Sequence, residues 1–171
     1  KAYTENSEDI FKNMLQWGKI YTPRNELCLE NVLQAGQAFR WILNEETNEY
    51  FTTMKIANNT DYSIVMLRQQ TDDFIECATS DKRCNIQDLI SHFESYFRIE
   101  VDIMTTHETQ WVVNDPKFKG IGSHGIRILG QEPWETLISF ICSTNNNISR
   151  ITKMCHALCT NYGKLIGKFG S

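Results

Sequence analysis

Three consecutive asparagines, Asn145, Asn146 and Asn147, end an apolar helical run, and Arg150 follows them. Asparagine side chains compete with the backbone for hydrogen bonds, so three in a row predict a break between two helices. An amide carries both donors and an acceptor, whereas a guanidinium carries only donors in a flat fork. Such groups suit the edges of nucleobases. The alternative interpretation is a polar loop that joins two helices and binds nothing.

Three further residues have both a structural and a functional interpretation. Gly36 lies in the stretch LQAGQAFRW (residues 33–41), where a glycine is typical of a hairpin turn. Arg40 either contacts phosphate or forms the solvent side of an alternating strand. Phe140 either packs in the core on the apolar face of its helix or lies beside a base pocket.

Short runs of alternating apolar and polar residues predict the elements that position these side chains. We expect strand-like structure from Glu26 onward, including Leu27, Leu29 and Val32-Leu33, with a turn at Ala35-Gly36. Further strands are predicted at residues 39–43, 50–56, 62–67 and 74–78. Four or five antiparallel strands joined by short turns make one sheet.

Helical spacing replaces this alternation in the second half. Ile86, Leu89, Ile90, Phe93 and Phe97 recur at helical intervals behind Asn85, a good N-cap. Weaker helical pieces are predicted at residues 101–110 and 116–119, and Gly120, Gly122 and Gly125 suggest a flexible joint. A helix opens at Glu132-Pro133 and runs through Ile141, and a second spans residues 147–162 with Gly163 as its C-cap. Its predicted apolar face consists of Ile148, Ile151, Met154, Cys155, Leu158 and Cys159.

Strands followed by helices predict an α+β fold. We expect an N-terminal extension (residues 1–24), a sheet-and-helix unit (25–124) and the start of a helical unit (125–171). The chain begins with Lys1 rather than Met, and we expect it to be part of a longer protein.

Charge is distributed unevenly along the chain. The formal net charge is -4, which does not indicate a nucleic-acid binder, but all 21 acidic residues lie at or before Glu135. The remaining 36 residues carry only Arg150, Lys153, Lys164 and Lys168, a net charge of +4. A basic segment attracts phosphates locally even in an acidic protein. A chance fluctuation in charge is the alternative.

Six cysteines occur without a secretory signal pattern, so reduced thiols are expected. The spacing of Cys155 and Cys159 also suits plain packing on one helix face. No second pair has the spacing of a structural zinc site, so we predict neither a metal nor any other cofactor. No apolar run approaches the length of about 20 residues that a membrane span needs, and no membrane partner is expected.

Two long motifs resemble those of the eukaryotic 8-oxoguanine DNA glycosylases, especially the fungal members. Residues 33–41 resemble the family's (S/A)GQ(S/A)FRW segment, and residues 131–151 resemble its Q(D/E)P…SFICS(S/T)NNNI(A/S)RI segment. The resemblance covers residues 27–163. It implies a TATA-binding-protein-like antiparallel sheet domain followed by the first helices of a helix-hairpin-helix glycosylase domain.

The resemblance also implies roles for individual residues. Gly36 matches the glycine whose carbonyl faces the damaged base, and Phe140 is a candidate for the same pocket. Asn145 matches the residue that fills the opened duplex, and Arg150 matches the reader of the opposite cytosine. Asn146, Asn147 and Arg40 are assigned to possible DNA contact or loop support. The family's catalytic lysine and aspartate are expected beyond Ser171, so this chain alone is expected to be inactive.

The implied activity is base-excision repair in the nucleus, with the mitochondrion as a second location. A monomer would excise 8-oxoguanine paired with cytosine in double-stranded DNA and then cleave the strand by β-elimination, without a cofactor. Because the catalytic hairpin is missing, a noncatalytic DNA-binding module is the alternative. A protein-interaction domain is a third interpretation.

Overall fold

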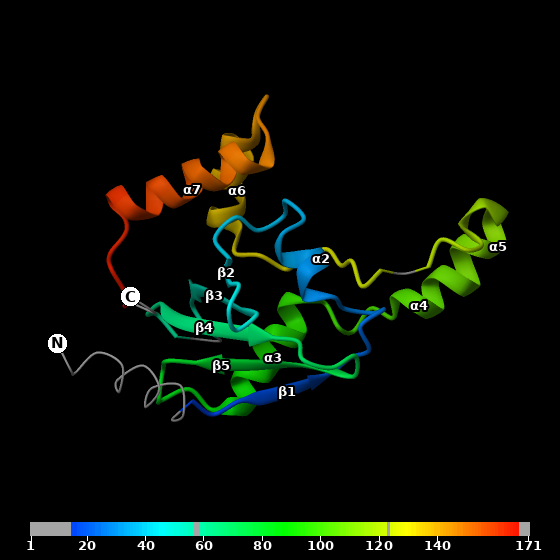
Figure 1. The fold of residues 1–171 in the computed structure, drawn as a ribbon, viewed down its shortest axis with the longest axis horizontal. Helices are drawn as coiled ribbons and strands as arrows, with labels where there is room; N and C mark the ends of the chain where they lie inside the picture. The colour runs from blue at the N-terminus through cyan, green and yellow to red at the C-terminus, as the bar shows by residue number, and fades with distance from the viewer. Residues whose placement is uncertain (1–14, 57–58, 123, 168–171) are drawn as a thin grey trace.

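The computed structural model describes residues 15–56, 59–122 and 124–167, which form a five-stranded antiparallel sheet and a set of helices (Figure 1). The strand order is β1-β5-β4-β3-β2. The bounds are Gly18–Tyr21 (β1), Ile42–Asn44 (β2), Glu49–Met54 (β3), Ser63–Arg68 (β4) and Phe74–Thr79 (β5). The predicted α+β class and antiparallel sheet are confirmed.

The core lies between the sheet and helix α3 (Ile86–Tyr96). Asn85 caps this helix as predicted, because its side chain accepts a hydrogen bond from the Gln87 amide. Leu89 and Phe93 of α3 are fully buried, and so is Phe97, which directly follows the last residue of the helix. They pack against inward-facing strand residues, which include Val65, Leu67, Ile75 and Cys77.

The strand predicted from Glu26 onward is wrong, because residues Leu29–Leu33 form the short helix α2. Leu29, Val32 and Leu33 are all buried, and their spacing also fits one face of a helix. The Gln69 side chain stabilises the start of this helix with two hydrogen bonds. It accepts one from the Leu29 backbone amide and donates one to the Leu27 carbonyl. That contact spans about 40 residues and has no signature in the local sequence.

The boundary predicted at residue 24 is also wrong, because β1 belongs to the sheet and pairs with β5. Residues 1–14 of the predicted extension lie outside the described part of the chain. The strand was missed because four residues are too few to show alternation. Ile20 is nevertheless almost completely buried, so β1 contributes to the core.

A helical arm follows α3 and extends away from the sheet (Figure 1). It consists of α4 (Ile103–Thr106), the π-helical turn η1 (His107–Trp111), α5 (Val112–Asn114) and the 3₁₀ turn η2 (Pro116–Phe118). These elements confirm the weak helical pieces predicted there. The chain then returns across the sheet unit to the last two helices.

This return is anchored rather than flexible. Gly125 has a φ of +66° and exchanges backbone hydrogen bonds with Asn25 and Cys28. A Cβ at this position would lie 2.3 Å from the Arg24 carbonyl oxygen, so only glycine fits. Leu129 is buried in the main core, and the boundary predicted at residue 125 therefore falls inside a segment that packs on the first unit.

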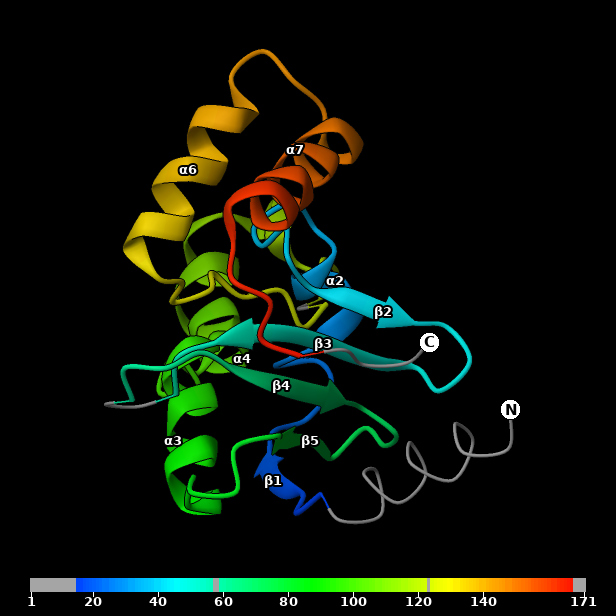
Figure 2. The same ribbon diagram turned by 90° about the vertical axis from the view of Figure 1, so that its left-hand side faces the viewer.

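The last two helices, α6 (Pro133–Ser143) and α7 (Ile148–Tyr162), lie side by side beyond the β2 edge of the sheet (Figure 2). Glu132 caps α6 and Asn147 caps α7, while Gly163 ends α7 as predicted. Of the predicted apolar face of α7, only Ile151 and Cys155 are buried. Among the described residues, no helix has the length and apolar character needed to cross a membrane.

Candidate nucleic-acid interface

The three asparagines at the joint between α6 and α7 (residues 144–147) differ in the contacts that their side chains make. Asn146 and Asn147 bind the protein itself. The Asn146 amide nitrogen donates to the Cys142 carbonyl at 3.0 Å, and its oxygen accepts from the Asn147 backbone amide at 3.0 Å. The Asn147 side chain in turn accepts from the Arg150 backbone amide at 3.1 Å, which starts α7.

Asn145 differs from its two neighbours. Its φ of +50° places it in the left-handed region, which asparagine tolerates better than most residues. The side chain is exposed and makes no hydrogen bond with any described residue. The turn therefore directs the Asn145 amide into solvent at the outer end of the joint.

Arg150 lies in the first turn of α7 and is also exposed. Its guanidinium forms no ion pair or hydrogen bond within the described part of the chain, so all of its donors are available to a ligand. The N-terminal end of a helix carries partial positive charge, and Lys153 adds a second cation one turn further on. The joint thus combines an exposed amide, an exposed guanidinium and a positive local field.

Gly36 lies next to this joint although more than 100 residues separate the two in sequence. It adopts a φ of +82°, which favours glycine. A Cβ at this position would lie 2.9 Å from Cδ1 of Ile148, the first residue of α7. The fold therefore brings together the two motifs that the resemblance singled out, with Gly36 against the start of the helix that carries Arg150.

Gln37 was not predicted to have a role, yet it links the first motif to the returning chain. Its side-chain nitrogen donates to the Arg127 carbonyl at 2.8 Å, and its side-chain oxygen accepts from the Leu129 amide at 3.1 Å. The Gln131 side chain donates to the Gln37 carbonyl at 2.9 Å. All three partners of Gln37 lie about 90 residues away in the sequence, so no local pattern predicts these hydrogen bonds. The only signal in the sequence is that Gln37 follows Gly36 in the first motif.

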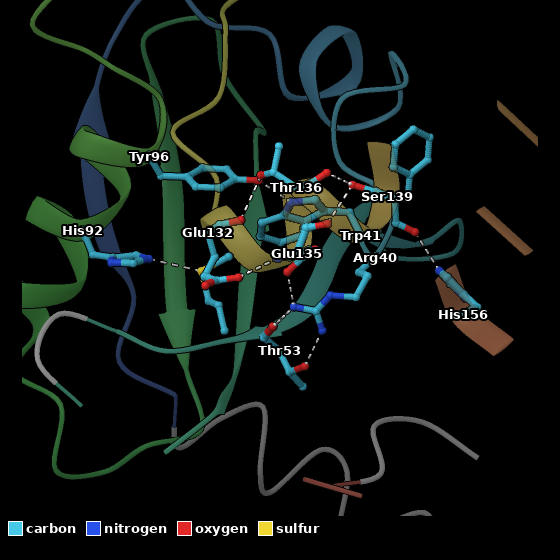
Figure 3. Close-up of polar contacts among 12 residues, drawn as sticks. Arg40, Trp41, Thr53, His92, Tyr96, Glu132, Glu135, Thr136, Ser139 and His156 are labelled. Carbon is cyan, nitrogen blue, oxygen red and sulfur yellow. Dashed lines mark hydrogen bonds and ion pairs between the residues drawn. The ribbon is translucent and has the colours of Figure 1, made fainter. Parts of the chain in front are cut away.

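Phe39 belongs to a second, small cluster of buried residues. Phe39 is buried with Cys142 of α6 and with Ile151 and Cys155 of α7. The Phe39 carbonyl accepts a hydrogen bond from Nε2 of His156 at 2.9 Å (Figure 3). The segment from Gly36 to Phe39 is thus the surface on which the helix pair rests.

The structure contradicts one of the two interpretations of Arg40, the one that places it on the solvent side of a strand. Its side chain is only 19% exposed and forms an ion pair with Glu135 of α6 at 2.7 Å. The guanidinium also donates to the Thr53 hydroxyl and carbonyl (Figure 3). Burial alone would lower the pKa of Arg40, but the hydrogen bond and charge of Glu135 outweigh it and raise that pKa.

Phe140 is 72% exposed, so of its two interpretations the one that packs it in the core is wrong, and its place beside a base pocket stays a prediction. Helix α6 buries its other face, where Ser139 and Cys142 are the buried residues. Leu137 and Ile141 are exposed together with Phe140. The sequence leaves both interpretations open, because periodicity shows that an apolar stripe exists but does not show what covers it.

Cys155 lies in α7 close to the joint and is buried. Burial raises the pKa of Cys155 to about 11, so its thiol is protonated at neutral pH. Among the described residues, no group of three histidine, cysteine or acidic side chains is arranged to hold a metal ion. The exposed amide of Asn145 and the exposed guanidinium of Arg150 are therefore the groups at this joint that can bind and orient a ligand.

Comparison with known proteins gives matches along most of the chain. Residues 19–137 match the family described as "8-oxoguanine DNA glycosylase, N-terminal domain". The chain is 51% identical over 152 residues to an N-glycosylase/DNA lyase of Saccharomyces cerevisiae, and the match covers 88% of this chain and 40% of that protein. The chain thus spans less than half the length of this relative.

Solved structures agree with this result. The structure of MBOgg1 in complex with a low-affinity DNA ligand has a TM-score of 0.68 and 27% identity, over 92% of this chain and 51% of that chain. The Clostridium acetobutylicum 8-oxoguanine glycosylase/lyase, bound to double-stranded DNA with cytosine opposite 8-oxoguanine, has a TM-score of 0.67 and 26% identity, over the same shares.

Proposed function

Because this chain belongs to the 8-oxoguanine DNA glycosylase family, we propose that the full-length protein removes 8-oxoguanine paired with cytosine from double-stranded DNA. The chain contributes the recognition of both bases. The observation that supports this proposal most directly is the joint at which Asn145 and Arg150 are exposed next to Gly36.

The reaction begins with the damaged base leaving the duplex, since its atoms cannot be reached inside the stack. The Gly36 carbonyl then accepts a hydrogen bond from N7–H of 8-oxoguanine. Guanine has a lone pair at N7, which opposes the same carbonyl. A mismatch of this kind costs about 1–3 kcal/mol, so this contact gives partial discrimination.

The opened duplex leaves a gap and an unpaired cytosine. Asn145 fills the gap, since its exposed amide can both donate and accept. Arg150 reads the cytosine, whose N3 and O2 are acceptors that match a donor-only fork. Thymine presents a donor at N3 and adenine a donor at its amino group, so both are disfavoured.

The chemical step is assigned to residues that follow Ser171. A lysine amine attacks C1′ as the bond to the damaged base breaks, and the base leaves with the bonding electron pair and takes up a proton. The amine then loses its protons as the C1′–O4′ bond of the sugar breaks and O4′ is protonated, and the resulting imine allows strand cleavage by β-elimination. An aspartate assists this step. Burial keeps the Cys155 thiol protonated at neutral pH, so Cys155 is not assigned this role.

Single-turnover excision by the full-length gene product tests the proposal. Duplexes carrying 8-oxoguanine opposite each of the four bases are compared for the unsubstituted protein and for Arg150→His. A bidentate contact to a base contributes about 1–3 kcal/mol of discrimination, so the preference for cytosine should fall by about 5- to 150-fold. Lys153→Met is the matched control, because it removes a cation from the same helix and should leave the preference unchanged.

Borohydride trapping separates enzyme from binding module. A covalent adduct with DNA containing 8-oxoguanine supports the glycosylase/lyase. Damage-dependent binding with neither excision nor an adduct would contradict the enzymatic proposal and favour a noncatalytic module. Equal base preference in the Arg150→His variant and the unsubstituted protein would remove Arg150 from the site.

A further inference from the structure

Arg40 connects the sheet unit to helix α6 through three hydrogen bonds. One terminal nitrogen donates both to Oε2 of Glu135 and to the Thr53 carbonyl, each at 2.7 Å. The other donates to the Thr53 hydroxyl at 3.0 Å. Thr53 belongs to β3 and Glu135 to the first turn of α6, so the guanidinium holds a strand and a helix together (Figure 3).

Little apolar packing supports this connection. Arg40 and Glu135 both line two hollows, one of about 300 Å³ and one of about 430 Å³. The helix pair is otherwise seated on the sheet unit by the small cluster around Phe39 and by the hydrogen bond from His156 to the Phe39 carbonyl. A helix whose polar contact borders two hollows can shift when that contact is lost.

Such a shift would reach the base-reading joint. Helix α6 is 11 residues long and ends at Ser143, and only Thr144 separates it from Asn145. The joint is tied to α6 by the Asn146 bond to the Cys142 carbonyl, so the joint moves when α6 moves. Gly36, by contrast, stays with the sheet unit, because Gln37 is bonded to the returning chain.

We infer that the Arg40–Glu135 ion pair is a positioning contact that sets the distance between the joint carrying Asn145 and Arg150 and the Gly36 backbone. This inference rests on the proposed function, since it deepens the account of how the two bases are read together. Arg40 is a positioning residue, not a catalytic one.

The geometry disfavours a phosphate contact for Arg40. Both terminal nitrogens are occupied by protein acceptors, and the Glu135 carboxylate neutralises the positive charge. A residue that binds phosphate would lower the salt dependence of DNA binding when removed. A positioning residue would leave the salt dependence unchanged and reduce the rate of the chemical step.

The test uses the full-length gene product with Arg40→Met, Arg40→Lys, Glu135→Gln and the double variant. Arg68→Met is the matched control, because Arg68 forms an ion pair with Glu76 at the same 2.7 Å and is 23% exposed, within the sheet. Single-turnover excision, preference for the opposite base and the slope of log K against log salt are measured for each protein.

We expect Arg40→Met and Glu135→Gln each to slow excision opposite cytosine by about 10- to 100-fold, as a small misplacement of recognition groups does. Arg40→Lys should recover part of the rate, and the double variant should be no slower than the slower single one, because both act through one contact. The salt slope should stay unchanged, and Arg68→Met should excise normally.

Two results would overturn the inference. One is excision and base preference in Arg40→Met equal to those of Arg68→Met. The other is a salt slope reduced by about one with additive single effects, which is the signature of a phosphate contact. If the unsubstituted protein does not excise 8-oxoguanine, the proposed function fails. Hydrogen exchange then decides the positioning role: faster exchange in α6 and residues 144–150 of Arg40→Met than of Arg68→Met supports it, and equal exchange refutes it.

Discussion

Replacing Arg127 by methionine would break the most deeply buried ion pair of the described residues. The Arg127 side chain is 3% exposed and pairs with Glu26, which is 11% exposed. The guanidinium also donates to the backbone carbonyls of Glu26, Arg98 and Val101 at 2.6–2.8 Å. Methionine keeps the apolar stem and removes all of these donors.

The expected loss of stability is large because the partner charge remains buried. Removing one member of a buried ion pair typically costs about 3–5 kcal/mol, out of a total stability of about 5–15 kcal/mol. Glu26 keeps two hydrogen bonds, from the amides of Ile103 and Met104 at the start of α4, so its carboxylate is not left without partners. We therefore expect about 3 kcal/mol, and a fall in Tm of about 6–12 °C for a chain of this size.

Urea unfolding followed by tryptophan fluorescence measures this change. Arg24→Met is the matched control, because Arg24 pairs with Asp72 at 3.8 Å and the two side chains are 43% and 83% exposed. Exposed ion pairs contribute little, so this control should unfold at the same urea concentration as the unsubstituted protein. Glu26→Gln combined with Arg127→Met should be more stable than Arg127→Met alone, since no unpaired charge then remains.

A loss below about 1 kcal/mol in Arg127→Met would refute the reasoning, because it would mean that the buried pair barely stabilises the fold. A double variant as unstable as the Arg127→Met protein would also contradict it. In that case the lost carbonyl contacts, rather than the unpaired carboxylate, would determine the cost.

Two further predictions concern single positions. Asn145→Gly should keep the stability of the protein, since glycine accepts a φ of +50°, but should weaken binding to DNA with an opened base pair. Asn145→Ala should weaken this binding and also lower Tm, because alanine strains the turn. Equal binding by both variants and the unsubstituted protein would show that the Asn145 amide does not contact DNA. Burial lowers the pKa of His92, so the unfolded chain binds the proton more readily and stability should fall as pH drops below about 6.5. His92→Phe should show a smaller fall in Tm between pH 7.5 and 5.5, and an equal fall would assign the effect to other groups.

The helices near the interface could be predicted from sequence because their signals are local. Asn85, Glu132 and Asn147 cap α3, α6 and α7, and each cap acts on amides two or three residues away. The predicted strands between residues 50 and 78 match β3, β4 and β5 closely. The alternation and the caps operate over a few residues, which is the range that a sequence pattern can show.

The short elements could not be predicted because distant residues decide them. Helix α2 depends on the Gln69 side chain about 40 residues away, and the close fit of Gly125 depends on the backbone at Arg24 and Cys28. The solvent exposure of Phe140 likewise depends on which residues cover α6, and the described residues leave it 72% exposed. Periodicity identifies an apolar stripe, but the tertiary contacts determine whether it is buried.

By itself, the sequence determined the chemistry available for recognition: amides and a guanidinium at a break between two helices, and a glycine-containing motif far upstream. Only the tertiary structure decided which of these groups stay exposed and which bind the protein itself. It places Gly36 against the start of α7, exposes Asn145 and Arg150, and binds Arg40 to Glu135. The physical reason is that side-chain identity sets what a group can bind, whereas its neighbours in space, often about 100 residues away, set what remains available.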